Sequence, residues 1–312
     1  MNAAAIRRRP DVALALAAAA VLVVGAVGTD GFLTSANFRA ILASVGILGI
    51  VAVGMTFITI SGNLFSLSLG VTVTVASMTF LSWLDLGVGP AIALSIALGA
   101  AVCGLQGLIV AVLGANPIVI TIAFGALQLA AAAKLAGGEA IYPDGGGFGW
   151  LASTAGGIPV SVFVLFGLVA AGDAWLRLSR AGRELYLCGE NRLAARAAAL
   201  RVSASTVIAF ALAGACAGVA GVLLGAANKN AGLVGGGDQY TFNAIAVVLV
   251  GGVAVTGGRG ATARTVLGAL FIAAISDMLL LRGYSTGIQT LVAGVFVLLA
   301  IVVMQLRRLS AR

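Results

Sequence analysis

The sequence predicts an all-α polytopic membrane protein with about ten transmembrane helices. Of its 312 residues, 61% are hydrophobic and only 9% are charged, and the mean hydropathy is +1.14. Soluble globular domains carry about 25% charged residues. The chain also has 44 glycines and only 5 prolines, a composition typical of helices that pack closely in lipid.

Ten apolar stretches approach the roughly 20 residues that a helix needs to cross a bilayer. They are 12–29, 41–61, 64–84, 89–113, 117–136, 157–176, 204–227, 241–257, 264–281 and 286–306. The first also looks like a signal peptide, but no clean A-x-A-like cleavage site follows it, so we expect an uncleaved span. Residues 1–312 are expected to form a single transmembrane domain.

The positive charges predict how these spans are oriented. Fourteen Lys and Arg residues fall on one side of the expected spans, and four (Arg39, Lys134, Lys229, Arg282) fall on or near the other. Since Lys and Arg are enriched in cytoplasmic loops, both termini and the segment at about 177–205 are expected in the cytoplasm. The loop at about 137–158 is expected outside. Topology thus accounts for the net charge of +8, and we expect no nucleic-acid partner.

Two apolar regions are interrupted by glycine and polar residues. The first interruption is "SGNLFSLSLG" at Ser61–Gly70, and the second is "NKNAGLVGGGDQYTFNAIA" at Asn228–Ala246. The first is either a buried break within the bilayer or a tight turn at its surface, because irregular backbone at that depth must lie inside protein or line a cavity. Interruptions in corresponding halves are typical of inverted-repeat transporters, so an inverted repeat is expected.

The stretch "GACAGVAGVLLG" predicts close packing of one helix against another. Its glycines at 214, 218, 221 and 225 include the small-xxx-small spacing that lets helix backbones approach each other in membranes. This pattern concerns structure and says little about a solute.

Residues for catalysis or metal binding are scarce. The chain has no histidine, and neither Lys134 nor Lys229 follows a glycine as in a P-loop. The three cysteines, Cys103, Cys188 and Cys216, show no disulfide or metal spacing. We expect no catalytic residue, no metal site and no cofactor bound by this chain, and hence a protein that is not an enzyme.

Neutral polar side chains within the spans are candidates for contact with a solute. They are Asn63, Ser66, Ser68, Gln106, Asn116, Thr121, Gln128, Asn243 and Gln289. Such groups suit a neutral polyhydroxylated solute, although hydrogen bonds between helices explain most of them better when each is taken singly. From this set we select Asn63, Ser66, Ser68, Thr121 and Asn243 for the solute path. Ser66, Ser68 and Asn243 rank first because they lie at the interruptions.

One acid leaves a second transport mechanism open. Asp277 lies near the outer end of the ninth span, and acids within a bundle often serve ion coupling. An ion-coupled secondary transporter is therefore the alternative to the function considered next. The competing interpretation is that Asp277 lies near the membrane interface and either snorkels to it or pairs with Arg282.

Four motifs occur in the order and spacing of a known permease family. "LSLG" at Leu67–Gly70 is similar to L-S-V-G, and "NPIVITIAFGALQL" to P-F-I-x-T-L-G, with Pro117 and Thr121 in place. "GRELYLCGENRLAARAAALRV" resembles G-R-x-x-Y-A-x-G-x-N-x-x-A-A-R-x-x-G-I, and "AIAVVLVGGVAVTGGRGATARTVLGAL" resembles the last family motif. The chain thus resembles, almost end to end, the permease subunit of bacterial sugar-type (ribose and monosaccharide) ABC importers, which are related to branched-chain amino-acid importer permeases.

Some family positions differ here. Ser66 stands where the family has Asp, and Thr241–Asn243 stands where it has Glu-Leu-Asp. Ala199 and Arg264 each replace a glycine. Acids expected near the path are thus neutral in this chain, so the resemblance does not carry ribose over as the solute. Sugars, polyols, nucleosides and autoinducers stay open.

The resemblance implies a multi-pass protein of the bacterial inner membrane that imports a neutral sugar-like solute. A second copy or a paralogue would complete the pore within the lipid, ATPase subunits would bind ATP below it, and a periplasmic solute-binding protein would deliver from outside. The ATPase would dock on a cytoplasmic helix, Asn191–Leu200, with Asn191 as its N-cap and Arg192 and Arg196 on one face. The expected coupling residues are Gly189, Glu190, Asn191, Ala194, Ala195 and Arg196.

Overall fold

The structure, a computed structural model, describes residues 10–29, 31–143, 146–232 and 237–309. Its helices are α2 (Pro10–Gly28), α3 (Ser35–Ile60), α4 (Leu69–Ser82), α5 (Val88–Leu113), α6 (Pro117–Leu135), α7 (Val160–Leu178), α8 (Arg180–Glu190), α9 (Arg192–Ala197), α10 (Val202–Asn228), α11 (Gly237–Val250), α12 (Thr262–Leu281) and α13 (Thr286–Leu309). Short 3-10 turns are η1 (Leu84–Leu86) and η2 (Gly149–Ala152), and β1 (Thr154–Ala155) pairs with β2 (Ile158–Pro159).

The described part of the chain is an all-α membrane protein. Each of the ten expected stretches contains a helix, and six of these helices (α3, α5, α6, α7, α10 and α12) are long and apolar enough to cross a membrane. Shorter apolar helices occur at Ala18–Gly28, Leu69–Ser82 and Thr286–Leu299. Ten spans and cytoplasmic termini remain predictions.

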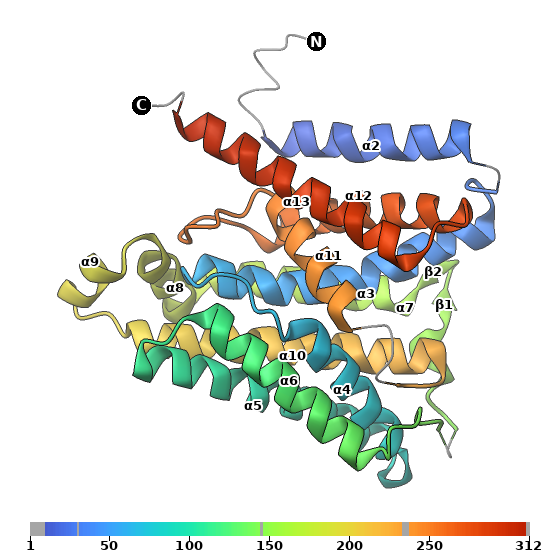
Figure 1. The fold of residues 1–312 in the computed structure, drawn as a ribbon, viewed down its shortest axis with the longest axis horizontal. Coiled ribbons are helices and arrows are strands. Elements are labelled where there is room, and N and C mark those ends of the chain that lie inside the picture. The colour runs from blue at the N-terminus through green and yellow to red at the C-terminus, as the bar shows by residue number, and fades with distance from the viewer. Residues whose placement is uncertain (1–9, 30, 144–145, 233–236, 310–312) are drawn as a thin grey trace.

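The two ends of the helix bundle differ in charge as the sequence predicts. Figure 1 shows α8 and α9 at one end and β1 and β2 at the other. The arginines at the end of α7 and in α8 and α9 gather at the first end. Lys134, in the last turn of α6, lies at the second end, as does Lys229, the C-cap of α10. The partition of charge is therefore a property of the fold.

Several expected boundaries were wrong; α3, for example, begins at Ser35 rather than at residue 41. The stretch expected at 64–84 becomes helical only at Leu69, and residues 61–68 form a non-helical break before it. The stretch expected at 241–257 is helical over Gly237–Val250 and ends at a turn in which Gly252 has φ +76°. That left-handed conformation is open to glycine and strained for other residues.

The two halves of the chain repeat one pattern of helix lengths. A helix of 26 residues (α3) precedes the 14-residue α4, and a helix of 27 residues (α10) precedes the 14-residue α11. The first residues of the two short helices, Leu69 and Gly237, are 168 positions apart, and so are their last residues, Ser82 and Val250. α3 and α10 run in opposite directions in Figure 1, the arrangement that the inverted repeat predicts.

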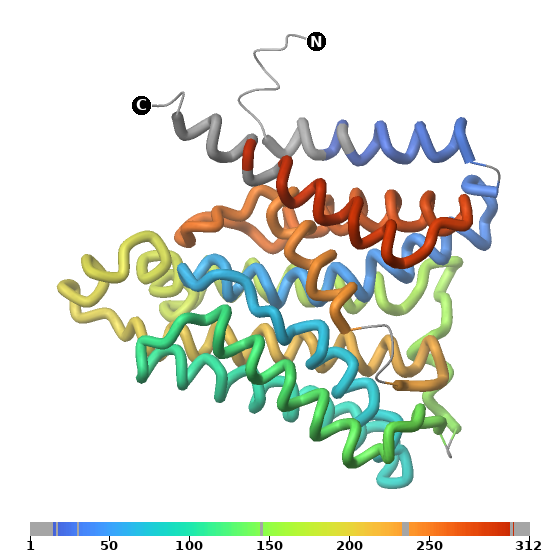
Figure 2. The backbone as a smooth tube through the Cα atoms, in the orientation of Figure 1, coloured from blue at the N-terminus to red at the C-terminus, as the bar shows by residue number. Residues whose placement is uncertain are grey.

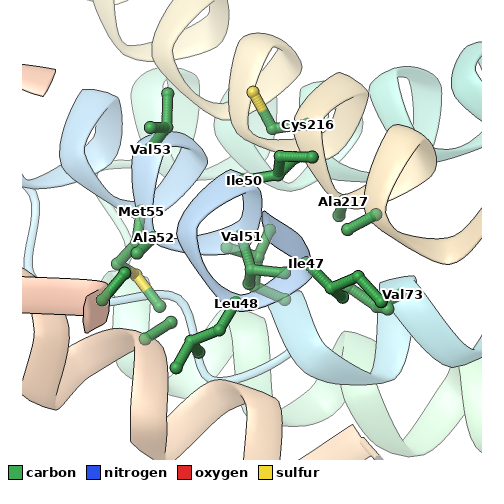
Figure 3. Close-up of a cluster of buried hydrophobic side chains, with 14 of the residues drawn as sticks. Ile47, Leu48, Ile50, Val51, Ala52, Val53, Met55, Val73, Cys216 and Ala217 are labelled. Atoms are coloured by element: carbon green, nitrogen blue, oxygen red, sulfur yellow. The ribbon is translucent and has the colours of Figure 1, made fainter. Parts of the chain in front are cut away.

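Helix α3 forms the centre of the core. Figure 3 shows its side chains, among them Ile50, Val51 and Val53, pointing outward around the whole helix, with Val73 of α4 and Cys216 of α10 beside them. A helix that is apolar on all sides must be surrounded by protein or lipid. Here it is protein, because 83% of the residues in an apolar 18-residue stretch of α3 are buried.

The glycine pattern of α10 packs this helix against α5, as predicted. Among the described elements, this pair has the most extensive contact. A Cβ on Gly214 would clash with the Gly99 carbonyl oxygen and would lie 2.7 Å from the Cβ of Cys103. A Cβ on Gly218 would lie 2.6 Å from the Cα of Ile96. The two backbones thus approach to a distance at which only glycine fits.

The outer loop has defined backbone pairing where it is described. β1 and β2 form a hairpin whose turn residues, Gly156 and Gly157, both have positive φ, as type I′ turns require. Ile141 exchanges backbone hydrogen bonds of 2.7 and 2.9 Å with Ala231, which follows α10. The loop is therefore tied to the second interruption. Residues 144–145 of this loop and 233–236 of that interruption lie outside the described residues.

Candidate functional site

The polar side chains of the break between α3 and α4 are buried inside the protein, whereas Leu64 of the same break is exposed. The exposed fractions of Asn63, Ser66 and Ser68 are 1%, 0% and 0%. The Leu67 backbone N–H donates to Thr121 Oγ1 at 3.1 Å, so α6 holds the irregular backbone in place. Burial of these polar side chains fits a break that is enclosed by neighbouring helices, and a break within the bilayer stays a prediction.

A cluster of neutral polar side chains surrounds the end of this break. Ser66 Oγ lies 3.2 Å from Ser68 Oγ, and Ser68 Oγ donates to Gln106 Oε1 of α5 at 2.9 Å. Thr121 of α6 completes the group through its bond to the Leu67 backbone. The structure thus brings together three of the five predicted solute-path residues, Ser66, Ser68 and Thr121. We call these three residues and Gln106 the serine cluster.

Gln106 has an unpaired amide nitrogen. Its side chain is fully buried, and Nε2 has no hydrogen-bond partner among the described residues. Turning the amide over would exchange its oxygen and nitrogen, so one of the two stays unpaired in either orientation. An unpaired buried polar group costs about 1–3 kcal/mol. In the sequence, Gln106 is one of nine neutral polar residues within the predicted spans. Only its contacts in the structure distinguish it from the other eight.

Gln128 lies near this cluster but differs from Gln106. It accepts from Thr72 Oγ1 at 3.0 Å and donates to the Phe124 carbonyl oxygen at 3.2 Å. Both ends of its amide are therefore paired, and the bond from Thr72 joins α4 to α6. Gln128 has the role in helix packing that the sequence left open for each polar residue.

The two short helices meet at their first turns. The Gly70 N–H of α4 donates to Thr241 Oγ1 of α11 at 2.9 Å, and a Cβ on Gly70 would clash with the Gly237 carbonyl oxygen. Asn243 is buried in α11, but no hydrogen bond joins it to the serine cluster in the described structure. Its role in the solute path stays a prediction.

Asn63 belongs to a different network from the other predicted solute-path residues. Its Nδ2 donates to Ser61 Oγ at 2.7 Å, and Ser61 Oγ donates to the Ile58 carbonyl oxygen at 2.7 Å. Its Oδ1 accepts from Arg192 Nη2 of α9. The structure thus links Asn63 to the predicted cytoplasmic segment.

Helix α9 is shorter than expected but capped as predicted. It spans Arg192–Ala197, and Asn191 Oδ1 accepts from the N–H groups of Leu193 and Ala194 at 3.0 Å each. The helix ends in a Schellman motif, in which Leu200 N donates to the Ala195 carbonyl at 3.0 Å. Ala199, where the family has glycine, takes the left-handed conformation of this motif, with φ +56°.

The predicted coupling residues divide into an inner and an outer group. Gly189 and Ala195 are buried, and Ala195 packs against Cys188 and Val202. The exposed members are Glu190, Asn191, Ala194 and Arg196. Arg192 and Arg196 lie four positions apart on α9, as expected, but Arg192 is partly buried and donates to Asn63, whereas Arg196 is exposed. Leu193, not predicted, is 78% exposed, and an apolar residue within this charged segment was the signal for it.

Four glycines join the α8–α9 segment to the rest of the chain, and we call them the glycine joint. They come from the start of the break, the end of α8 and the loop before α12: Gly62, Gly189, Gly257 and Gly258. A Cβ on Gly189 would clash with the Ile60 carbonyl oxygen and would lie 2.8 Å from Gly258 N. The Gly258 N–H donates to the Ile60 carbonyl at 2.9 Å. Three segments thus touch backbone to backbone.

Charged and polar side chains surround the glycine joint. Tyr186 donates to the Gly260 carbonyl oxygen at 2.7 Å, and Glu190 lies 3.8 Å from Arg259 at the surface. Burial, and then the charge of Asp173, raise the pKa of Tyr186, which keeps its hydroxyl protonated as a donor. Burial, and then the charge of Arg196, lower the pKa of Arg192, although arginine stays charged in proteins.

Two acids have structural partners. Asp277 Oδ2 accepts from Asn37 Nδ2 at 2.8 Å, whereas Arg282 donates to the Gly28 carbonyl at 2.7 Å and to Thr29. The expected Asp277–Arg282 pairing was therefore wrong. Asp173, to which the sequence assigned no role, accepts from the N–H and hydroxyl of Thr262 at the start of α12. A carboxylate is favourable at the first turn of a helix.

Comparison with known proteins agrees with this architecture. The family model described as "Branched-chain amino acid transport system / permease component" matches residues 37–303. The ribose import permease protein RbsC of Escherichia coli (strain K12) is 29% identical over 293 residues, which cover 88% of this chain and 87% of RbsC. The autoinducer 2 import system permease protein LsrD of Yersinia enterocolitica is 31% identical over 315 residues, 95% of this chain and 92% of LsrD.

A third relative is the probable ABC transporter permease protein y4mJ of Sinorhizobium fredii, 30% identical over 303 residues, 93% of this chain and 88% of that protein. No solved structure matches the chain. The apolar helices and the family match describe a multi-pass protein of the inner membrane. The chain belongs to the family of branched-chain amino acid transport system permease components, and its relatives include ABC permeases for sugar-type solutes.

Proposed function

We propose that this chain is the membrane subunit of an ABC importer that moves a neutral, hydroxylated solute inward, driven by ATP that separate subunits hydrolyse. The observation that carries the proposal is the serine cluster. It lies at a buried helix break in a permease of this family, and it holds an unpaired amide nitrogen. Broken helices that meet inside a bundle are the usual place for a transport site.

The chemistry of the cluster favours hydroxyl groups. Serine and threonine hydroxyls both donate and accept hydrogen bonds, and an amide nitrogen donates. Ser66, Ser68, Thr121 and Gln106 carry no charge, so a charged solute would find no counter-ion among them. The names of two relatives refer to ribose and autoinducer 2. Sugars, polyols and similar compounds are therefore the first solutes to test.

Three kinds of partner follow from the proposal. ATPase subunits dock on the outer surface of α8 and α9, where Leu193, Ala194 and Arg196 are exposed. A second permease chain, identical or paralogous, completes the pore. A periplasmic solute-binding protein approaches the end of the bundle that carries β1 and β2 (Figure 2).

The energy source separates this proposal from an ion-coupled transporter. The complex is reconstituted in liposomes with its ATPase subunits, and uptake of radiolabelled ribose and of autoinducer 2 is measured with ATP inside and all ion gradients collapsed. Uptake that needs ATP and survives this collapse supports an importer. Uptake that follows a proton or sodium gradient without ATP, and is lost in Asp277→Asn, supports the secondary transporter instead.

Replacing Gln106 with leucine should weaken transport without unfolding the protein. Leucine fills a similar volume and removes the unpaired amide nitrogen. It also removes the acceptor of the Ser68 bond, but Ser68 Oγ keeps Ser66 Oγ as a partner, so the apparent Tm in detergent should change little. Loss of one hydrogen bond to the solute should raise KM about tenfold, which corresponds to about 1.4 kcal/mol. Gln128→Leu is the matched control, because it breaks two existing bonds and should lower Tm with little effect on KM. An unchanged KM in Gln106→Leu contradicts the solute contact.

Replacing Ala194 with glutamate should block assembly with the ATPase. Ala194 is exposed on α9, so the larger acid leaves the permease folded but keeps a docked surface apart. We expect at least a tenfold loss of co-purified ATPase subunit and of uptake, with Ala194→Ser as the tolerated control. Ala195 does not suit this test, because it is 4% exposed and its replacement would disturb the packing of α9. Normal assembly of Ala194→Glu would place the ATPase elsewhere.

A further inference from the structure

The α8–α9 segment contacts the first residues of the break, Ser61–Asn63, which we call the base of the break. Side-chain hydrogen bonds make this contact as well as the backbone packing of the glycine joint. Arg192, in the first turn of α9, donates to Asn63 in the break. Asn63 in turn donates to Ser61, and Ser61 donates to the Ile58 carbonyl in the last turn of α3. A continuous series of hydrogen bonds therefore runs from the predicted docking helix to the end of α3.

The link lies close to the serine cluster along the chain. Asn63 is three residues before Ser66 and five before Ser68, the N-cap of α4. The short run between them has little freedom, because Ser66 N donates to Met55 Sδ at 3.3 Å and Leu67 N donates to Thr121. Only Leu64 and Phe65 separate Asn63 from this held stretch, so a displacement of Asn63 larger than these two residues can absorb would move the serines or break these bonds.

The link also resists separation. Asn63 is 1% exposed, so moving Arg192 away would leave the Asn63 carbonyl oxygen buried and unpaired, at a cost of about 1–3 kcal/mol. The glycine joint beside it packs backbone against backbone and has no flexible side chains that could absorb a shift. The α8–α9 segment and the base of the break are thus held to move together.

We propose that the Arg192–Asn63 hydrogen bond is a positioning contact that transmits movement of the α8–α9 segment to the break between α3 and α4. The inference rests on the proposed function, because an ATPase must supply the movement. Asn63 then acts between docking surface and solute cluster, and it need not touch the solute. Arg192 acts through Asn63, while the exposed Leu193 and Ala194 face the partner.

The test follows the break directly as nucleotide is added. Leu64 lies in the break and is 38% exposed, whereas Cys103, Cys188 and Cys216 are buried, so a Leu64→Cys probe can be labelled with a maleimide selectively. The labelling rate is measured in the reconstituted complex with its ATPase subunits, with and without ATP and orthovanadate. Asn63→Leu and Arg192→Met remove the link, and Arg201→Met changes an exposed arginine of the same cytoplasmic segment.

We expect the nucleotide to change the labelling rate at least threefold in the Leu64→Cys complex and in Arg201→Met. The change should disappear in Asn63→Leu and Arg192→Met, with the ATPase subunit still co-purifying in the same ratio and ATP hydrolysed without uptake. The double variant should be no worse than either single variant, because the two residues form one contact. Arg192→Lys, which keeps a donor, should restore part of the response.

An unchanged nucleotide response in Asn63→Leu or Arg192→Met overturns the inference. Should Asn63→Leu fail to fold, the half-exposed Arg192→Met carries the test. A complex with intact Asn63 and Arg192 that shows neither ATP-dependent uptake nor a nucleotide response overturns the proposed function, and the inference with it. A complex that transports with ATP, and whose link variants do the same, overturns the inference alone.

Discussion

Replacing Gly214 with leucine should leave no folded permease. A Cβ at this position already clashes with the Gly99 carbonyl oxygen and lies 2.7 Å from Cys103 Cβ. Each extra group forced into a tight core costs about 1–3 kcal/mol, and more where backbone must move, against a total stability of about 5–15 kcal/mol. Gly214→Ala should lower the apparent Tm, and Gly214→Leu should abolish the monodisperse peak in size-exclusion chromatography.

The control lies on the same pair of helices. A Cβ on Gly104 of α5 would meet Ala211 Cβ of α10 at 3.5 Å, an ordinary contact. Gly104→Ala should therefore keep or raise Tm, since alanine favours the helix by roughly 1 kcal/mol over glycine. If Gly104→Ala destabilises as much as Gly214→Ala, the close approach of α5 and α10 is not what makes Gly214 essential.

Replacing Gly189 with alanine should abolish transport even though the apolar helices still insert. The added methyl group would clash with the Ile60 carbonyl oxygen and would lie 2.8 Å from Gly258 N and 3.0 Å from Gly62 N. All three neighbours are backbone atoms, so no rotamer change relieves the crowding. We expect a loss of roughly 3 kcal/mol, seen as a lower Tm, and loss of uptake in the reconstituted complex.

Gly167→Ala is the matched control for Gly189→Ala. Gly167 lies in α7, and a Cβ there would meet nothing within 4 Å. This variant should assemble and transport normally. Wild-type uptake and Tm in Gly189→Ala would show that the three segments need not touch for the permease to work.

Much of the fold follows from local features of the sequence. Apolar runs place the helices, because a span needs a minimum length of apolar surface in lipid. Asn191 predicted the start of α9 from its side chain alone. Two of the boundaries that failed, the start of α4 at Leu69 and the end of α11 at Val250, lie where glycine and polar residues interrupt an apolar run. Hydropathy continues across such a point, whereas the helix does not.

The types of residue in the candidate site could be predicted from the sequence, but which of these residues contact one another could be predicted only in part. Ser66, Ser68 and Thr121, which the sequence selected one by one as neutral polar groups, lie together in the structure. Gln106 joins them from α5, 38 positions from Ser68, and nothing in its local sequence distinguishes it from Gln128. Asn63 lies next to the same break and yet bonds to α9.

The sequence alone determined that this protein lies in a lipid membrane, how many apolar stretches it has, at which end of the helix bundle the basic residues gather, and its family. These depend on composition and on short motifs, which are local. Only the tertiary structure decided which amide is unpaired, that Ala195 faces inward and Ala194 outward, and that Asn63 meets Arg192 across 129 positions. Such facts depend on contacts between distant segments, and the Asn63–Arg192 contact lies beside the point where glycines let three backbones meet.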